Sequence, residues 1–438
     1  MHTDLTTGSI KTHLIKLSIP AITGYFFHTL FNVTDTYFAG VISTKALAAL
    51  SLSASIFFMI LAIAIGMSEA LTSLVGNALG EKETKKAQAI ALNGVWFALI
   101  LSVALAIFGV ISAPYLVQAL GDPSYVPQTL NYINIILYAT LFFIGSFFFN
   151  ALLNAVGDTV SFRNILILTA FLNVLLDYIF VTYFSFGVKG IAFATIISEF
   201  ITMSYLFYKL QKTSLWISFT AFSLDISTIK ELFKHGFAPS MNMFMMAFGM
   251  YIITYFVAPY GKEAVAAYGI GMRIEQIFLI PVIGLSVATL SIVSQNNGAK
   301  LFDRIMPSTS LAIKFGFMLS AFGVVSFYTY GDSLASLLTH DIQVIEQSVL
   351  YLKICGFAFF GFVMIFIYIA MLQGIKKPAV IFPVSIYRQV LAPIIFFTAF
   401  SFFDFEIYTI WLGLDFIIFS SALYLWWYAK RSMMMILL

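Results

Sequence analysis

The sequence predicts an all-α integral membrane protein that crosses the bilayer twelve times, in two homologous lobes of six helices each. Three observations lead to this prediction. Of the 438 residues, 61% are hydrophobic and only 10% are charged, with a mean hydropathy of +0.96, whereas a soluble domain carries about 25% charged residues. The apolar residues gather in twelve runs of spanning length, and the second half of the chain repeats the first.

Each apolar run is about 20 residues or longer, which is enough to cross a bilayer at 1.5 Å per residue. The expected helices cover 17–40, 46–76, 88–112, 128–153, 160–183, 188–208, 237–258, 264–293, 309–331, 345–372, 380–402 and 407–429. A polar stretch from Lys209 to Lys234 divides them into six plus six. We therefore expect a first lobe over residues 1–215 and a second lobe over residues 216–438.

The repeat is clearest at the end of the second helix of each half. Residues 66–82 align without gaps to residues 284–300, with seven identities, and Pro20 meets Pro239 within one residue. Because six is an even number, both lobes run the same way through the membrane. The repeat axis is then expected to be a pseudo-twofold along the membrane normal.

Basic residues set the orientation. If the N-terminus lies inside, most Lys and Arg residues, Arg388 among them, fall on the inner side of the membrane, as the positive-inside rule favours. We expect both termini in the cytoplasm and the protein in the cell inner (plasma) membrane.

The first expected helix combines a charge with a flexible point. Asp35 is a carboxylate in an otherwise uncharged span, and such residues usually face a bundle interior or water and serve a function. Pro20, near the start of this span, favours a bend. His28 lies two turns before Asp35 and is a candidate for a proton path, and a neutral histidine packed in the bundle is an equal alternative. Tyr37 is a candidate cavity residue. The combination predicts a proton- or ion-driven switch.

Three polar residues in the fifth and sixth helices are expected at the depth of Asp35. Asp177 lies about six residues from the outer end of its helix, Asn173 is four residues earlier on the same face, and Thr195 has a compatible depth. Two carboxylates at one site would titrate as a unit, or they would hold Na⁺ together with neutral ligands. For Asn173 and Thr195, the alternative to a role as ligands is packing between helices. The repeat places no carboxylate opposite Asp35 or Asp177, so coupling is expected in the first lobe.

Other charged residues also fall within the expected spans. Glu199 shares a face with Thr195. Arg273 and Glu275 lie mid-helix in the second lobe, where a spacing of two turns them away from each other. Ion pairs between helices, for example Arg273 with Asp415, and a substrate-binding role are equal alternatives.

The sequence contains no motif for ATP binding, zinc hydrolysis or a serine nucleophile. We therefore expect neither an enzyme nor a cofactor, and no certain metal site beyond a Na⁺ alternative at Asp35, Asn173, Asp177 and Thr195.

Several of these features together resemble a known family. The Pro20 and Asp35 helix, Asn150 to Asp158 with its Gly-Asp turn, and the Asn173 to Asp177 pair are similar to the multidrug and toxic compound extrusion (MATE) transporters, with an acidic first lobe most similar to the DinF-like branch. The resemblance implies a V-shaped fold and export of lipophilic, often cationic drugs in exchange for H⁺ or Na⁺. It also implies that Asp35, Asn173, Asp177 and Thr195 form the cation site and that Asn150 is a polar cavity residue.

The hypothesis from the sequence is a secondary multidrug antiporter, acting as a monomer on small organic molecules in the lipid bilayer. Protonation of Asp35, with Na⁺ as the alternative, would let the first helix bend near Pro20 and expel the drug; antibiotic resistance is an expected consequence. The rival function is a lipid-linked oligosaccharide flippase. A flippase needs basic residues in its cleft, and Arg273 is the only one expected well inside a span.

Overall fold

The computed structural model describes residues 3–216, 224–401 and 405–437. The first lobe consists of α1 (Ile10–Ile42), α2 (Thr44–Gly80), α3 (Thr84–Leu120), α4 (Val126–Tyr138), α5 (Thr140–Ala155), α6 (Val160–Asp177) with the π-helical turn Tyr178–Tyr183, and α7 (Val188–Leu210). The second lobe consists of α8 (Ile226–Val257), α9 (Lys262–Gly298), α10 (Ile305–Ser336), α11 (Ile342–Cys355), α12 (Ala358–Gly374), α13 (Ile381–Ile386) with the π-helical turn Tyr387–Leu391, α14 (Ala392–Ser401) and α15 (Ile407–Leu437). No strand occurs among these residues.

The helices match the expected spans. Ten helices of the described chain are long and apolar enough to cross a membrane, and two further spans are bent pairs: α4 with α5 at 49° and α11 with α12 at 53°. The bent pairs are the fourth and tenth spans, the same position in each lobe. Twelve crossings are therefore confirmed, whereas the domain boundary after residue 215 stays a prediction, because residues 217–223 are not described.

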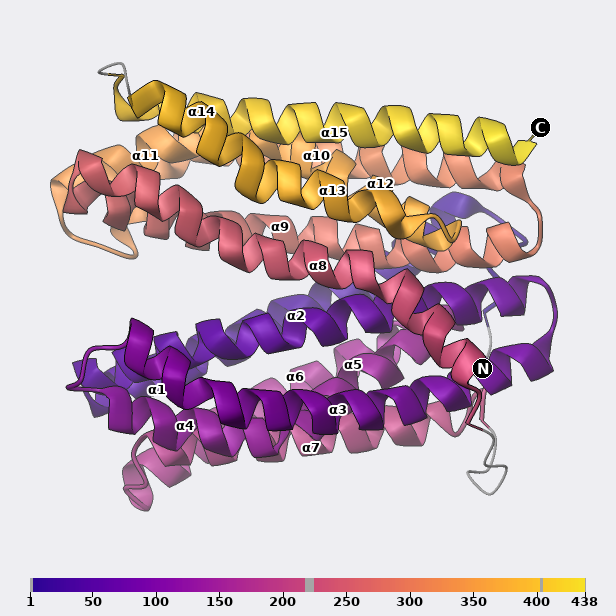
Figure 1. Ribbon diagram of the computed structural model, residues 1–438, viewed down its shortest axis with the longest axis horizontal. Coiled ribbons are helices and arrows are strands. Elements are labelled where there is room, and N and C mark those ends of the chain that lie inside the picture. Colours follow the sequence, from indigo (N-terminus) through magenta and orange to yellow (C-terminus); the bar gives the residue numbers. More distant parts are fainter. Residues whose placement is uncertain (1–2, 217–223, 402–404, 438) are drawn as a thin grey trace.

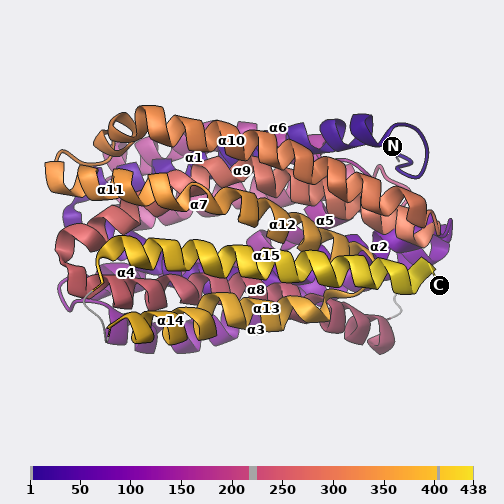
Figure 2. The same ribbon diagram turned by 90° about the horizontal axis from the view of Figure 1, so that it is seen from above.

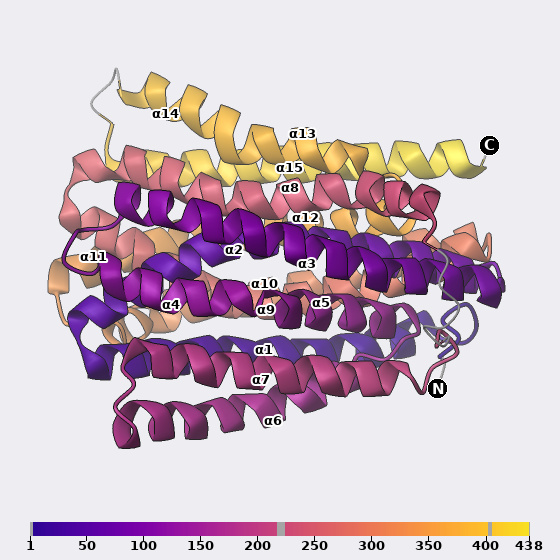
Figure 3. The same cartoon turned by 60° about the horizontal axis from the view of Figure 1, so that its bottom comes forward.

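Figure 1 shows the two lobes as layers, with α8 to α15 above α1 to α7, diverging toward one end. Both termini lie at the opposite end, as Figure 2 also shows. In Figure 3, α6 and α7 form the outer edge of the first lobe and α14 that of the second. An even number of crossings in each lobe accounts for the placement of both termini at one end.

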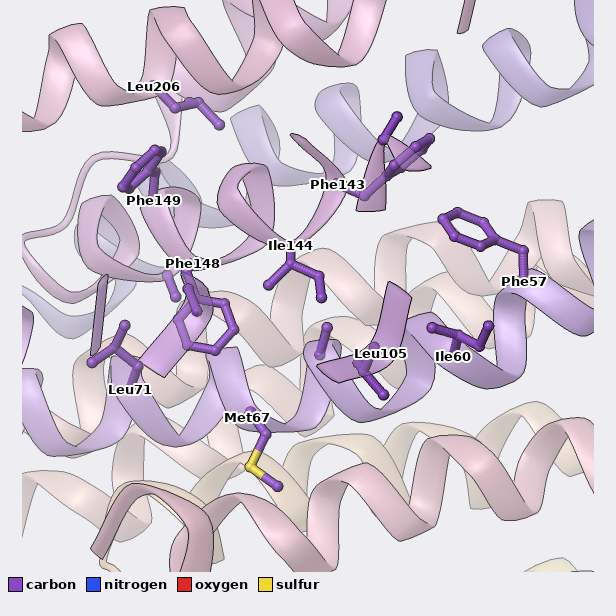
Figure 4. Packing of buried hydrophobic residues seen from close by; sticks show 14 of the residues in the cluster. Phe57, Ile60, Met67, Leu71, Leu105, Phe143, Ile144, Phe148, Phe149 and Leu206 are labelled. Carbon is purple, nitrogen blue, oxygen red and sulfur yellow. The ribbon is translucent and has the colours of Figure 1, made fainter. Parts of the chain in front are cut away.

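The interior of the first lobe is an aromatic and aliphatic core between α2, α3 and α5 (Figure 4). Phe143 and Phe57 meet edge to face with ring centroids 4.8 Å apart, and Phe148 and Leu71 are fully buried. In a lipid environment such contacts stabilise mainly through close packing. This packing fixes the helices that carry the polar site.

The lobes join at the end that holds the termini, where backbone carbonyls of one lobe accept hydrogen bonds from the other. Asn77 Nδ2 donates to the Gly374 carbonyl at 2.9 Å, and Gln295 Nε2 donates to the Ala155 carbonyl at 2.7 Å. The N-terminal segment lies in the same seam. Leu5 is fully buried, and its N–H donates to Gln295 Oε1 at 3.0 Å while its carbonyl accepts from Asn296 Nδ2 at 3.1 Å.

Arg388 does not lie at the inner side of the membrane, where it was expected. Arg388, counted with the inner-side charges, lies near the middle of the span Pro378–Phe400 and is 4% exposed. The apolar residues around Arg388 keep the mean hydropathy of this span high, and the arginine side chain turns into the helix bundle and away from lipid.

Candidate functional site

Asp35 lies on the inner face of α1 and is 5% exposed. Its Oδ2 accepts a hydrogen bond from Thr195 Oγ1 of α7 at 2.9 Å, and the same hydroxyl lies 2.9 Å from the Ile191 carbonyl. A threonine has one hydroxyl proton. With Asp35 ionised, the proton points to Asp35; with Asp35 protonated, the acid donates to Thr195, which then donates to Ile191. The pair therefore accommodates both charge states without moving a helix.

Asn173 and Asp177 of α6 approach the same carboxylate, and both are fully buried. Neither meets hydrogen-bond geometry: both polar atoms of Asn173, both oxygens of Asp177 and Oδ1 of Asp35 have no hydrogen-bond partner among the described residues. Buried polar atoms are normally satisfied. This group can share protons between two carboxylates or can hold a small cation with carboxylate and amide oxygens.

Tyr132 of α4 completes the cluster, and the sequence analysis missed it. It is 7% exposed, beside Thr195 and near both Asp35 and Asp177. Its phenol is a donor that favours an ionised carboxylate. The chain has 22 tyrosines, and only depth in the membrane could have pointed to this one. Tyr132 lies about as many residues from the outer end of the fourth span as Asp35 does from the outer end of the first.

A second polar level lies one helical turn from Thr195. Glu199 of α7 is buried near Asp35 and accepts a hydrogen bond from Ser146 Oγ of α5 at 3.2 Å. Asn150, four residues after Ser146, is buried with its Oδ1 unpartnered within the described chain. The predicted residues Glu199 and Asn150 thus extend the Asp35 cluster along α5 and α7.

The structure does not bring every candidate to this cluster. His28 stacks on Phe31 with ring centroids 6.4 Å apart, and no hydrogen bond in the described part of the chain joins it to Asp35. Tyr37 is 66% exposed and contacts Phe38 edge to face. Pro20 is buried within α1, which remains one continuous helix, so a bend at this position stays a prediction.

Of the charged residues expected within the second-lobe spans, Glu275 and Asp415 lie near each other, whereas Arg273 lies apart from them. Glu275 is buried beside Tyr351, whereas Arg273 is exposed. No ion pair found among the described residues includes Arg273 or Asp415, so the structure does not contain the ion pair that was one of the two alternatives for these residues. The spacing of Arg273 and Glu275 explains this, because it turns the arginine to the outer face of α9 when the glutamate faces inward.

Comparisons with known proteins agree with this architecture. The family model MatE matches residues 20–179 and again 239–398, one match in each lobe. The chain is 30% identical to "Probable multidrug resistance protein NorM" of Thermotoga maritima over 366 residues, which cover 80% of this chain and 77% of that protein. It is 26% identical to the "FAD transporter" of Shewanella oneidensis over 373 residues, covering 83% and 82%.

Solved structures share the fold. A MOP superfamily transporter from Pyrococcus furiosus superposes with a TM-score of 0.94 at 23% identity, covering 99% of this chain and 98% of that one. A structure described as the outward-facing conformation of a multidrug resistance MATE family transporter also gives 0.94, at 22% identity and the same coverage. With a family model that matches both lobes and a relative at 30% identity, the chain belongs to the MatE family of multi-pass membrane transporters.

Proposed function

We propose that this chain is a secondary multidrug antiporter that exports lipophilic, often cationic, organic compounds in exchange for H⁺. The observation that carries the proposal is the buried pair of Asp35 and Asp177, with Thr195 placed to serve either charge state of Asp35. The relatives named as multidrug resistance or export proteins, from Thermotoga maritima and Staphylococcus aureus, support the substrate class.

Protonation would act through charge and hydration. An ionised Asp35 requires donors or water around it, whereas a neutral Asp35 is compatible with a narrower, drier site. We infer that neutralisation lets α1 bend near Pro20, closes the first-lobe site and releases the drug outward. One proton crossing about 100 mV supplies roughly 2.3 kcal/mol. Na⁺ held by Asp35, Asn173, Asp177 and Thr195 is the alternative coupling ion. The proposal includes an inner-membrane location, cytoplasmic termini, a monomer and the DinF-like branch.

The test is ethidium transport in vesicles that contain the purified full chain, driven separately by a pH gradient and by a Na⁺ gradient. Transport driven by the pH gradient without Na⁺ is expected, and Asp35→Asn should abolish it while the protein elutes as a folded species. Transport only with Na⁺ would reassign the site as an ion cage. Undiminished transport by Asp35→Asn would contradict the mechanism.

A second candidate follows from the Shewanella relative named as an FAD transporter. We infer export of a flavin nucleotide as the alternative cargo, and loading the same vesicles with FAD tests it directly. If neither gradient moves ethidium or FAD, the lipid-linked oligosaccharide flippase becomes the better hypothesis.

A further inference from the structure

A buried arginine lies in the middle of the second lobe. Arg388 belongs to the π-helical turn Tyr387–Leu391, and its Nη2 donates to Asn242 Oδ1 of α8 at 3.2 Å. Its Nε and Nη1 are buried and have no hydrogen-bond partner, and none of the ion pairs in the described chain includes Arg388. An arginine is charged at every physiological pH, and buried charges are normally paired. The fold therefore presents a cation without a protein counter-charge.

The groups around the guanidinium are suited to an anion. Asn242 Oδ1 accepts from both Arg388 and Ser385 Oγ, the latter at 2.7 Å. Asn242 therefore holds the guanidinium in place through its amide oxygen, and its NH₂ group points away from these donors. Carboxylate and phosphate oxygens match the planar fork of a guanidinium. The polar atoms of Arg388 that lack a partner are both hydrogen-bond donors, so the ligand they fit is an anion and not a cation.

Flexible side chains lie on the same face of α8. Met245 and Met246 follow Asn242 by three and four residues, so they share its face, and both are partly buried. One turn further, a Cβ on Gly249 would lie 2.2 Å from Gln389 Oε1, so this face of α8 packs directly on the π-helical turn. Methionines change rotamer readily and can make room beside the guanidinium without a backbone shift.

Each lobe carries a charged residue at a π-helical turn, and the two charges are opposite in sign, although the repeat of 20–179 by 239–398 shows that the two turns are not at equivalent positions. In the first lobe, Asp177 directly precedes the π-helical turn Tyr178–Tyr183 of the fifth span; in the second lobe, Arg388 lies within the turn of the eleventh span. Such turns occur often at functional sites. We propose that Arg388 and Asn242 form an anion-binding subsite that takes the carboxylate or phosphate group of an amphipathic organic ligand. The subsite goes beyond cation-driven export and does not depend on it.

Direct binding tests the proposal. The purified full chain in neutral detergent is titrated with fluorescein, an aromatic carboxylate, and binding is followed by fluorescence anisotropy. Arg388→Gln is expected to weaken fluorescein binding by about tenfold or more, the usual effect of losing a charge-assisted hydrogen bond. The matched control is Arg273→Gln, which removes the same charge from an exposed position in another span, and it should leave the affinity within about twofold.

Two competitors distinguish the sources of the anion. Displacement of fluorescein by inorganic phosphate supports a site for free anions, and displacement only by phosphatidylglycerol in the micelles supports a lipid headgroup site. If Arg388→Gln does not elute as a folded species, two other variants test the proposal. Arg388→Lys keeps the charge but loses the planar fork, and Asn242→Ala removes the amide that holds the guanidinium. Each variant should weaken fluorescein binding. Unchanged affinity in these variants, or no fluorescein binding by the wild type, overturns the proposal. Ethidium transport is measured separately, so failure here leaves the export proposal standing.

Discussion

A single methyl group at the seam between the lobes should change which conformation the protein adopts. Gly298, the last residue of α9, lies against α2 so closely that a Cβ would be 1.9 Å from the Asn77 carbonyl oxygen and 2.7 Å from its carbonyl carbon. Ordinary contacts begin at 3.4 Å, so Gly298→Ala must push α2 and α9 apart by more than an ångström. The obstacle is backbone, which no rotamer change relieves.

The size of the effect follows from the contacts. Overpacking costs about 1–3 kcal/mol, and separation also weakens the bond from Asn297 Nδ2 to Asn77 Oδ1 at 2.6 Å. These contacts exist only where the lobes meet, so the cost falls on this conformation. A population shift of roughly 5- to 150-fold toward a state with the seam open is expected.

The assay measures the distance across the seam. Spin labels at Lys82→Cys and Lys300→Cys, placed in a Cys355→Ser background, report the separation of the loops that follow α2 and α9 by pulsed electron paramagnetic resonance. Gly298→Ala should move the distance distribution to longer values. The control is Gly269→Ala on the same helix, where a Cβ meets nothing within 4 Å. If Gly298→Ala and Gly269→Ala give the same distribution, the packing argument is refuted.

Three further predictions concern two contacts at the seam and one helix cap. Gln373→Leu should lower the thermal stability of the purified protein. It removes the 2.8 Å hydrogen bond that Gln373 Nε2 donates to Glu69 Oε2 across the lobes, and it leaves the Glu69 carboxylate unpaired. Adding Glu69→Gln to this variant should restore part of the lost stability. Deletion of residues 1–8 should speed amide hydrogen exchange around Gln295, since it removes the fully buried Leu5, whose N–H donates to Gln295. Protection equal to that of the wild type would show that Leu5 does not shield this seam. Asp225→Ala should fray the start of α8, whose first turn donates to this carboxylate, and unchanged exchange there would argue against the cap.

Much of the fold was predictable because hydropathy reports membrane spans directly. The expected spans begin and end within a few residues of the helices except where a helix continues into water, as α8 does by starting at Ile226. The sequence repeat also corresponds to a repeat of packing. Gly66 of α2 approaches the Ser240 N–H of α8, and its counterpart Gly284 of α9 approaches α1 at the Ile22 N–H. Small residues are needed wherever helices of the two lobes cross closely.

The bends in the fourth and tenth spans were not predictable in the same way. Neither bend contains a proline: α4 ends at Tyr138 with Ala139 between it and α5, and α11 ends at Cys355 before Gly356. Hydropathy is continuous across both, so the apolar run reads as one helix. The direction of each bend depends on the packing of neighbouring helices, which a run of apolar residues does not encode.

The site was predictable to the extent that charge is costly in a bilayer. Asp35 and Asp177 stood out because a carboxylate in a membrane span is costly and usually has a function. Equal depth was enough to place Thr195 with them. Tyr132 lies at a similar depth, but depth alone did not single it out among the 22 tyrosines of this aromatic-rich chain. Arg388 had the same signal, because it falls within the expected span 380–402, but it was counted with the inner-side charges.

The misplacement of Arg388 changes what the two lobes are expected to do. The repeat placed no carboxylate opposite Asp35 or Asp177, so coupling was expected in the first lobe. The structure gives the first lobe a buried carboxylate pair and the second lobe a buried guanidinium without a counter-ion. Duplicated lobes that keep their packing but carry opposite charges can bind opposite ends of one molecule, or two different ligands. A comparison of fluorescein binding with ethidium transport in Arg388→Gln and Asp35→Asn separates these cases. One shared ligand requires both variants to lose both activities, whereas independent sites require each variant to lose only one.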